Sequence, residues 1–101
     1  MARLLLQSGG YVVVGEAATA VDALDSAREL EPDLVLLDVL LPDGNGADVA
    51  EALALLPHPP GVVLISSYAG GGLGPRLANT PVLGFLQKDE LTVPRLAELF
   101  G

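Results

Sequence analysis

The chain has 101 residues, half of them hydrophobic, and its five basic against thirteen acidic residues give a formal net charge of −8, which argues against binding to nucleic acid or to an anionic membrane surface. There is no cysteine and a single histidine, His58, so disulfide frameworks, thiolate chemistry and zinc sites are excluded. No apolar run is long enough to span a membrane and the first residues lack a signal-peptide layout, so we expect one cytoplasmic domain over residues 1–101, without an output domain.

The first half of the chain alternates between strand and helix patterns. A short β-branched run predicts a strand at residues 11–14. Residues 20–30 follow, with apolar side chains every three positions, and predict an amphipathic helix. A continuous apolar run at residues 34–37 predicts a buried strand, and residues 47–56 predict a second helix that ends at Pro57.

The second half continues the alternation. Strands are predicted at residues 62–65 and 84–87, and a last helix at residues 92–100, with Thr92 as its N-cap. The glycine-rich residues 69–81 predict a flexible connection with a short helix at 76–79. A nucleotide site is the less favoured interpretation, because the spacing of a phosphate-binding loop is absent. Regular alternation predicts an α/β fold with a doubly wound parallel sheet.

Asp38 is the strongest candidate for a functional group. It ends the buried strand at residues 34–37, and such strand ends are where open α/β sheets place their chemistry. A turn begins soon afterwards, and its Asp43 is open to two interpretations, a solvated turn residue or a water-mediated metal contact.

These residues resemble the receiver domains of bacterial two-component response regulators. Asp38, followed by Pro42 and Gly46, resembles the phosphoacceptor and its turn. Ser66 and Lys88, which follow strands, resemble the hydroxyl residue and the lysine of that family. Order and spacing agree over nearly the whole chain, and the stretch from Gly9 is similar to short, stand-alone receivers of the actinobacterial type.

The resemblance implies a flavodoxin-like fold with strand order 2-1-3-4-5 and a role in a phosphorelay. A sensor histidine kinase would transfer a phosphoryl group to Asp38, and a downstream protein effector would read the change. Ser66 and Phe85 would form the switch, with Phe85 at the aromatic position. A receiver of this kind is not an enzyme.

One part of the family pattern is missing. Receivers have a first strand ending in an acidic pair that binds magnesium, and residues 3–10 resemble only the end of the helix that follows it. We therefore expect an N-terminally truncated fold that lacks its central strand. With only the Asp38 carboxylate and the Leu40 main chain as ligands, we expect magnesium binding to be weak or lost.

Several alternatives stay open. Three explanations compete for the missing strand and acidic pair: a mis-assigned chain start, a non-functional fragment, or a pseudo-receiver that binds partners without phosphate. Residues 4–6 could instead enter the sheet as a strand, or two chains could pair as a homodimer. A hydrolase with an aspartyl-phosphate intermediate ranks last, because Leu40 stands where its second aspartate would be.

Overall fold

The computed structural model describes residues 2–7, 10–66 and 80–100. Its strands are β1 (Ala2–Gln7), β2 (Tyr11–Ala17), β3 (Leu34–Asp38), β4 (Leu40–Leu41), β5 (Gly44–Asn45), β6 (Gly61–Ser66) and β7 (Gly84–Gln87). Its helices are α1 (Ala20–Leu30), α2 (Gly46–Leu53), the short 3₁₀ turn η1 (Lys88–Glu90) and α4 (Val93–Phe100). None of these helices has the length and hydropathy needed to cross a bilayer.

The main sheet of the described residues has five strands in the order β2-β1-β3-β6-β7. This is the 2-1-3-4-5 order of a flavodoxin-like fold, which confirms the predicted α/β class. β3 pairs in parallel with β6, and β6 pairs in parallel with β7. The carboxyl ends of these strands therefore meet at one edge, where Asp38 lies.

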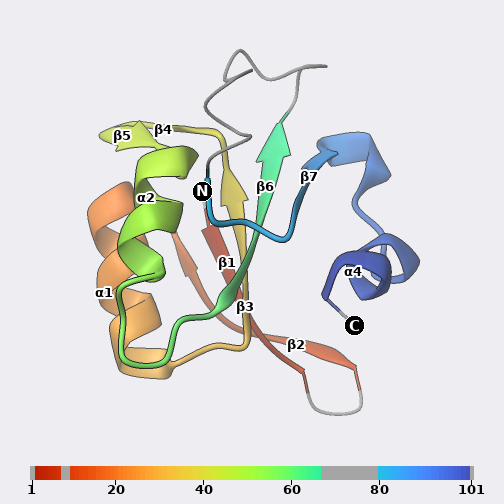
Figure 1. Cartoon of the computed structure of the whole chain (residues 1–101), viewed down its shortest axis with the longest axis horizontal. Coiled ribbons are helices and arrows are strands. Elements are labelled where there is room, and N and C mark those ends of the chain that lie inside the picture. The colour runs from red at the N-terminus through yellow and green to blue at the C-terminus, as the bar shows by residue number, and fades with distance from the viewer. Residues whose placement is uncertain (1, 8–9, 67–79, 101) are drawn as a thin grey trace.

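The prediction for the N-terminal residues was wrong. Residues 3–10 were expected to end a helix and the first strand of the family was expected to be missing, but β1 occupies the interior position between β2 and β3 (Figure 1). It runs antiparallel to both neighbours, so that Ala2 lies opposite Leu37 of β3. The low-ranked alternative, in which residues 4–6 enter the sheet, is the arrangement observed.

Burial explains why these residues lie between β2 and β3. Ala2 and Leu4 are fully buried and Leu5 is 3% exposed. A buried strand edge in the middle of a sheet would leave backbone N–H and C=O groups without partners, which is costly. β1 supplies both the hydrogen-bond partners and the apolar side chains that a central strand must provide.

The two faces of the sheet are covered by different helices, as a doubly wound fold requires. Figure 1 shows α1 and α2 on one side of the sheet and α4 on the other. The first side holds the larger core cluster, to which α1 contributes Ala23 and α2 contributes Leu53. On the second side, Leu96 of α4 packs with Leu36 of β3 and Ile65 of β6.

Side-chain caps fix where the helices begin. Thr19 accepts a hydrogen bond from the backbone N–H of Asp22 at 3.1 Å, and Asn45 accepts one from Asp48 at 2.9 Å. Thr92 caps α4 as predicted, accepting from Arg95 N at 3.4 Å. α2 ends at Leu53, three residues before the predicted end at residue 56, because the chain tightens into turns before Pro57.

The remaining boundaries agree with prediction to within three residues. β7 has the predicted bounds, and β2, β3 and β6 are each slightly longer than expected. The short helix predicted at residues 76–79 lies outside the described residues.

Candidate functional site

Asp38 is held at the carboxyl edge of the sheet by the backbone on both sides. It lies opposite Ile65 in the parallel pairing of β3 with β6. The next residue, Val39, donates a hydrogen bond to the Ile65 carbonyl at 2.9 Å and accepts one from Gly46 N at 2.7 Å. The backbone on either side of β3's last residue is thus fixed, while the Asp38 side chain itself is partly exposed.

A cavity of about 400 Å³ opens beside Asp38, on the face of the sheet that α4 covers. Its lining combines two cations, one carboxylate and three apolar side chains: Arg3, Lys88, Asp38, Leu36, Ile65 and Leu91. The structure thus brings the predicted pair Asp38 and Lys88 to one cavity, although they are fifty residues apart in the chain. This is the arrangement expected when parallel strands end at a shared edge.

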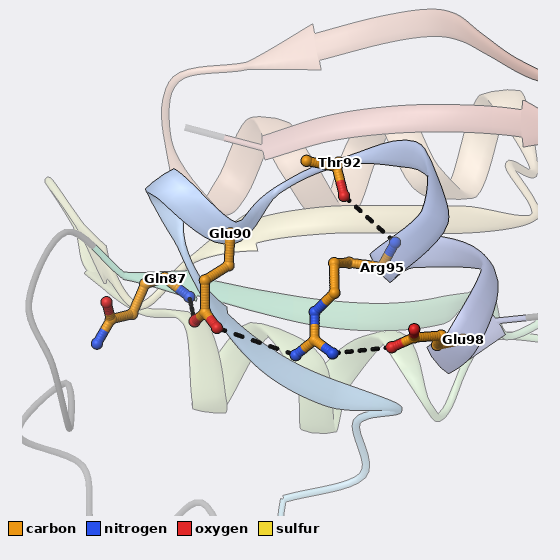
Figure 2. Close-up of polar contacts among 5 residues, drawn as sticks. All are labelled: Gln87, Glu90, Thr92, Arg95 and Glu98. Atoms are coloured by element: carbon orange, nitrogen blue, oxygen red, sulfur yellow. Dashed lines mark hydrogen bonds and ion pairs between the residues drawn. The ribbon is translucent and has the colours of Figure 1, made fainter.

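The turn that carries Lys88 is tied to α4 by polar contacts (Figure 2). Glu90 accepts a hydrogen bond from Gln87 N at 3.1 Å, which closes the turn η1 at its start. Arg95 of α4 lies 3.9 Å from Glu90 and 2.8 Å from Glu98. These ion pairs are half exposed and individually weak, but together with the turn they restrict the backbone at Lys88.

The other predicted site residues are not among the described residues that line this cavity. Ser66 is the last residue of β6, directly after the lining residue Ile65, and is 7% exposed. Phe85 of β7 packs against the opposite side of the sheet, with the α1 and α2 core. Leu40 is 70% exposed in the small β4-β5 pair. The role of its main chain as a magnesium ligand stays a prediction.

Arg3 is the residue that the sequence interpretation missed. It enters the cavity because β1 is reversed, which puts the start of the strand, and not its end, at the Asp38 edge. Its Nε lies 3.3 Å from a carboxylate oxygen of Glu16 on β2, and both side chains are about half exposed. The sequence carries no local signal for Arg3, because its place at the cavity depends on the pairing of β1 with β3.

Asp43 has a role that neither of its two interpretations included. Its carboxylate accepts hydrogen bonds from the first turn of α1, from Ala20 N at 2.7 Å and from Val21 N at 3.3 Å. The bond from Ala20 is the main cause that lowers the pKa of Asp43 below its ordinary value; desolvation opposes it and the bond from Val21 reinforces it. A carboxylate at a helix N-terminus also interacts favourably with the helix dipole.

This contact makes stability depend on pH. Because the pKa is lowered in the folded state, the contact stabilises the fold above about pH 4, the ordinary aspartate pKa, and the stabilisation is lost as the pH falls through the lower folded value. Asp43→Ala should lower the thermal midpoint near neutral pH, and the gap to wild type should narrow in acid. Asp25→Ala removes an exposed carboxylate later in α1. It should lower the thermal midpoint by less, and by an amount that changes less with pH. A difference in thermal midpoint between Asp43→Ala and wild type that does not change with pH would contradict the stabilising role of the Asp43 carboxylate.

Comparisons with known proteins agree on one family. A family model described as the response regulator receiver domain matches residues 1–99. The virulence-factor transcription regulator BvgA of Bordetella pertussis is 33% identical over 88 residues, which cover 87% of this chain and 42% of that protein. The chain thus spans less than half the length of this curated relative.

A solved structure and an enzyme are also among the similar proteins. The receiver domain of the response regulator NarL from Mycobacterium tuberculosis superposes with a TM-score of 0.75 at 34% identity, covering 90% of this chain and 73% of that one. A protein-glutamate methylesterase/protein-glutamine glutaminase of Desulfotalea psychrophila is 38% identical over 69 residues, 68% of this chain and 19% of that protein.

Proposed function

The chain belongs to the response regulator receiver domain family, and we propose that it accepts a phosphoryl group on Asp38 from a sensor histidine kinase. The observation that carries this proposal is the shared cavity of Asp38 and Lys88 at the carboxyl edge of the sheet. A carboxylate beside an ammonium group is suited to receive a phosphoryl group, because the spreading negative charge of the transfer is neutralised locally.

The transfer step is a displacement at phosphorus. A carboxylate oxygen of Asp38 attacks the phosphorus atom, and the bond from phosphorus to the imidazole nitrogen of the donor histidine breaks. The nitrogen keeps the bonding electron pair and takes up a proton. With acetyl phosphate as donor, the phosphorus–oxygen bond breaks instead and acetate leaves with the electron pair.

Ser66 and Phe85 are suited to report the change. Ser66 ends the strand next to Asp38, and Phe85 lies opposite Leu64 on the neighbouring strand, two residues before the Ser66 position. A new phosphoryl charge at Asp38 would favour a shift of the Ser66 hydroxyl toward it. Phe85 is only partly buried, so a change of its rotamer would alter the surface near β7.

The signal would pass by protein contact with a downstream effector in the cytoplasm, and not by turnover of a substrate. The family consists mainly of signalling proteins, although the methylesterase shows that receivers also occur in enzymes. The kinase and the effector are proposed by class only.

The proposed function predicts that acetyl phosphate adds one phosphoryl group to the purified chain in buffer with magnesium, and that Asp38→Asn abolishes the addition. The near-isosteric change keeps the shape of the side chain and removes the nucleophilic carboxylate. Intact-mass spectrometry measures the product, and Asp25→Asn on the exposed surface of α1 is the matched control.

Two results would contradict the proposal. The first is equal labelling of wild type and Asp38→Asn. The second is no labelling of a wild-type chain that unfolds cooperatively in a thermal melt, because a folded receiver that accepts no phosphoryl group is a pseudo-receiver.

A further inference from the structure

Magnesium, the cation that the family implies, fits the residues around Asp38 poorly. Magnesium prefers six oxygen ligands in octahedral geometry. The described residues contain no group of three acidic, histidine or cysteine side chains that could hold a metal ion. Of the described residues, the charged side chains that share the cavity with Asp38 are both cations, Arg3 and Lys88.

Among the described residues, the cavity brings two cations together in an acidic protein. Arg3 and Lys88 line it with one carboxylate, Asp38, whereas the whole chain carries a formal net charge of −8. The Glu16 carboxylate that pairs with Arg3 is not among the described lining residues. Apolar side chains, Leu36, Ile65 and Leu91, form the rest of the lining. Such a lining favours an anion over a cation.

The geometry of Arg3 leaves it able to bind an anion. The contact with Glu16 uses Nε, while the two Nη nitrogens carry the other N–H donors of the guanidinium group. A guanidinium binds phosphate oxygens through paired hydrogen bonds, with more geometric specificity than an ammonium. β1 fixes the backbone of Arg3, because it pairs with β2 on one side and with β3 on the other.

We propose that Arg3, together with Lys88, holds the phosphoryl group at Asp38, so that this site binds phosphate without a divalent cation. The inference rests on the proposed function of Asp38 as the phosphoryl acceptor. Arg3 is then a substrate-binding residue, supplied by the reversed central strand.

Binding of inorganic phosphate in the presence of a metal chelator tests this directly. The chain with Asp38→Asn is used as background, because this change removes the carboxylate that opposes an anion and makes the measurement independent of phosphoryl transfer. Chemical-shift titration of backbone amides near residues 38 and 88 should show saturable binding. Adding Arg3→Gln should weaken it about tenfold or more, as expected for loss of a charge-assisted hydrogen bond.

Two matched variants separate anion binding from structure. Glu16→Gln breaks the same ion pair as Arg3→Gln, yet it should retain or strengthen phosphate binding. Arg28→Gln removes an exposed arginine of α1 that lies outside the cavity and should have no effect. If Glu16→Gln weakens phosphate binding as much as Arg3→Gln does, loss of the Arg3–Glu16 ion pair explains both effects. The inference that Arg3 binds the phosphate is then wrong.

Labelling by acetyl phosphate in chelator then distinguishes this inference from the proposed function. Labelling within about twofold of the rate with magnesium, lost in Arg3→Gln, supports both. Labelling that requires magnesium and is unchanged in Arg3→Gln overturns the role of Arg3 but leaves Asp38 as the acceptor. Phosphate binding that depends on Arg3, in a chain that is never labelled, supports the anion site and overturns the proposed function.

Discussion

Replacing Leu4 by alanine is expected to lower the free energy of unfolding by about 2–5 kcal/mol, the range for truncation of a buried leucine. Leu4 is fully buried at the centre of β1, between β2 and β3. A loss of this size is a large part of the total stability of a small domain, about 5–15 kcal/mol. Chemical denaturation monitored by circular dichroism measures it.

Leu6→Ala is the matched control for Leu4. Leu6 lies in the same strand but is 40% exposed, so its truncation should cost about 1 kcal/mol or less. Similar small losses of unfolding free energy for both variants would show that residues 2–7 do not form a buried interior strand of the sheet.

Gly46→Ala is expected to destabilise the fold and to slow phosphorylation of Asp38. A Cβ atom at position 46 would lie 2.5 Å from the Asp38 carbonyl oxygen and 2.9 Å from Cδ2 of Leu64. The carbonyl belongs to a paired strand and cannot move away, so the start of α2 must shift. Overpacking of this kind typically costs about 1–3 kcal/mol. The backbone shift would also displace Asp38 from its position in the cavity.

Gly44→Ala controls for the general effect of adding a methyl group. Its Cβ atom would meet only Ala20 Cβ, at an ordinary distance of 3.9 Å, and neither glycine has a positive φ angle. The difference between the variants therefore reports the close approach of α2 to β3. Equal unfolding free energies and equal labelling rates for both would contradict this interpretation.

The sequence predicted well the features that depend on local pattern or on a shared sheet edge. The apolar run before Asp38 placed that residue at the end of β3. Parallel strands end at one edge, so Lys88 could be expected near Asp38, and the structure places both at one cavity. Helix starts were predicted within one residue, because caps such as Thr92 are short-range signals.

The N-terminal strand shows where sequence interpretation failed. Two apolar runs, at residues 4–6 and 11–14, flank Gly9 and Gly10, which is a pattern typical of a β-hairpin. The resemblance to receiver domains favoured a helix end instead. Whether residues 2–7 enter the sheet depends on their pairing with β3, a contact between residues about thirty positions apart. Local patterns carry no information about such pairing.

Two site features depended on the same kind of long-range contact. Arg3 reaches the Asp38 cavity only because β1 is reversed. Asp43 caps α1 across 23 residues of sequence, which neither interpretation of this turn residue anticipated. In both cases the residue type was visible in the sequence, but the partner was set by the tertiary fold.

Locating the phosphoryl group in the chain tests the central claim most directly. After treatment with acetyl phosphate, borohydride reduction converts an aspartyl phosphate into a stable alcohol, and peptide mapping by tandem mass spectrometry then identifies the modified residue. We expect the modification at Asp38. Modification at Asp43 or at exposed carboxylates such as Asp25, with Asp38 unmodified, would contradict the account.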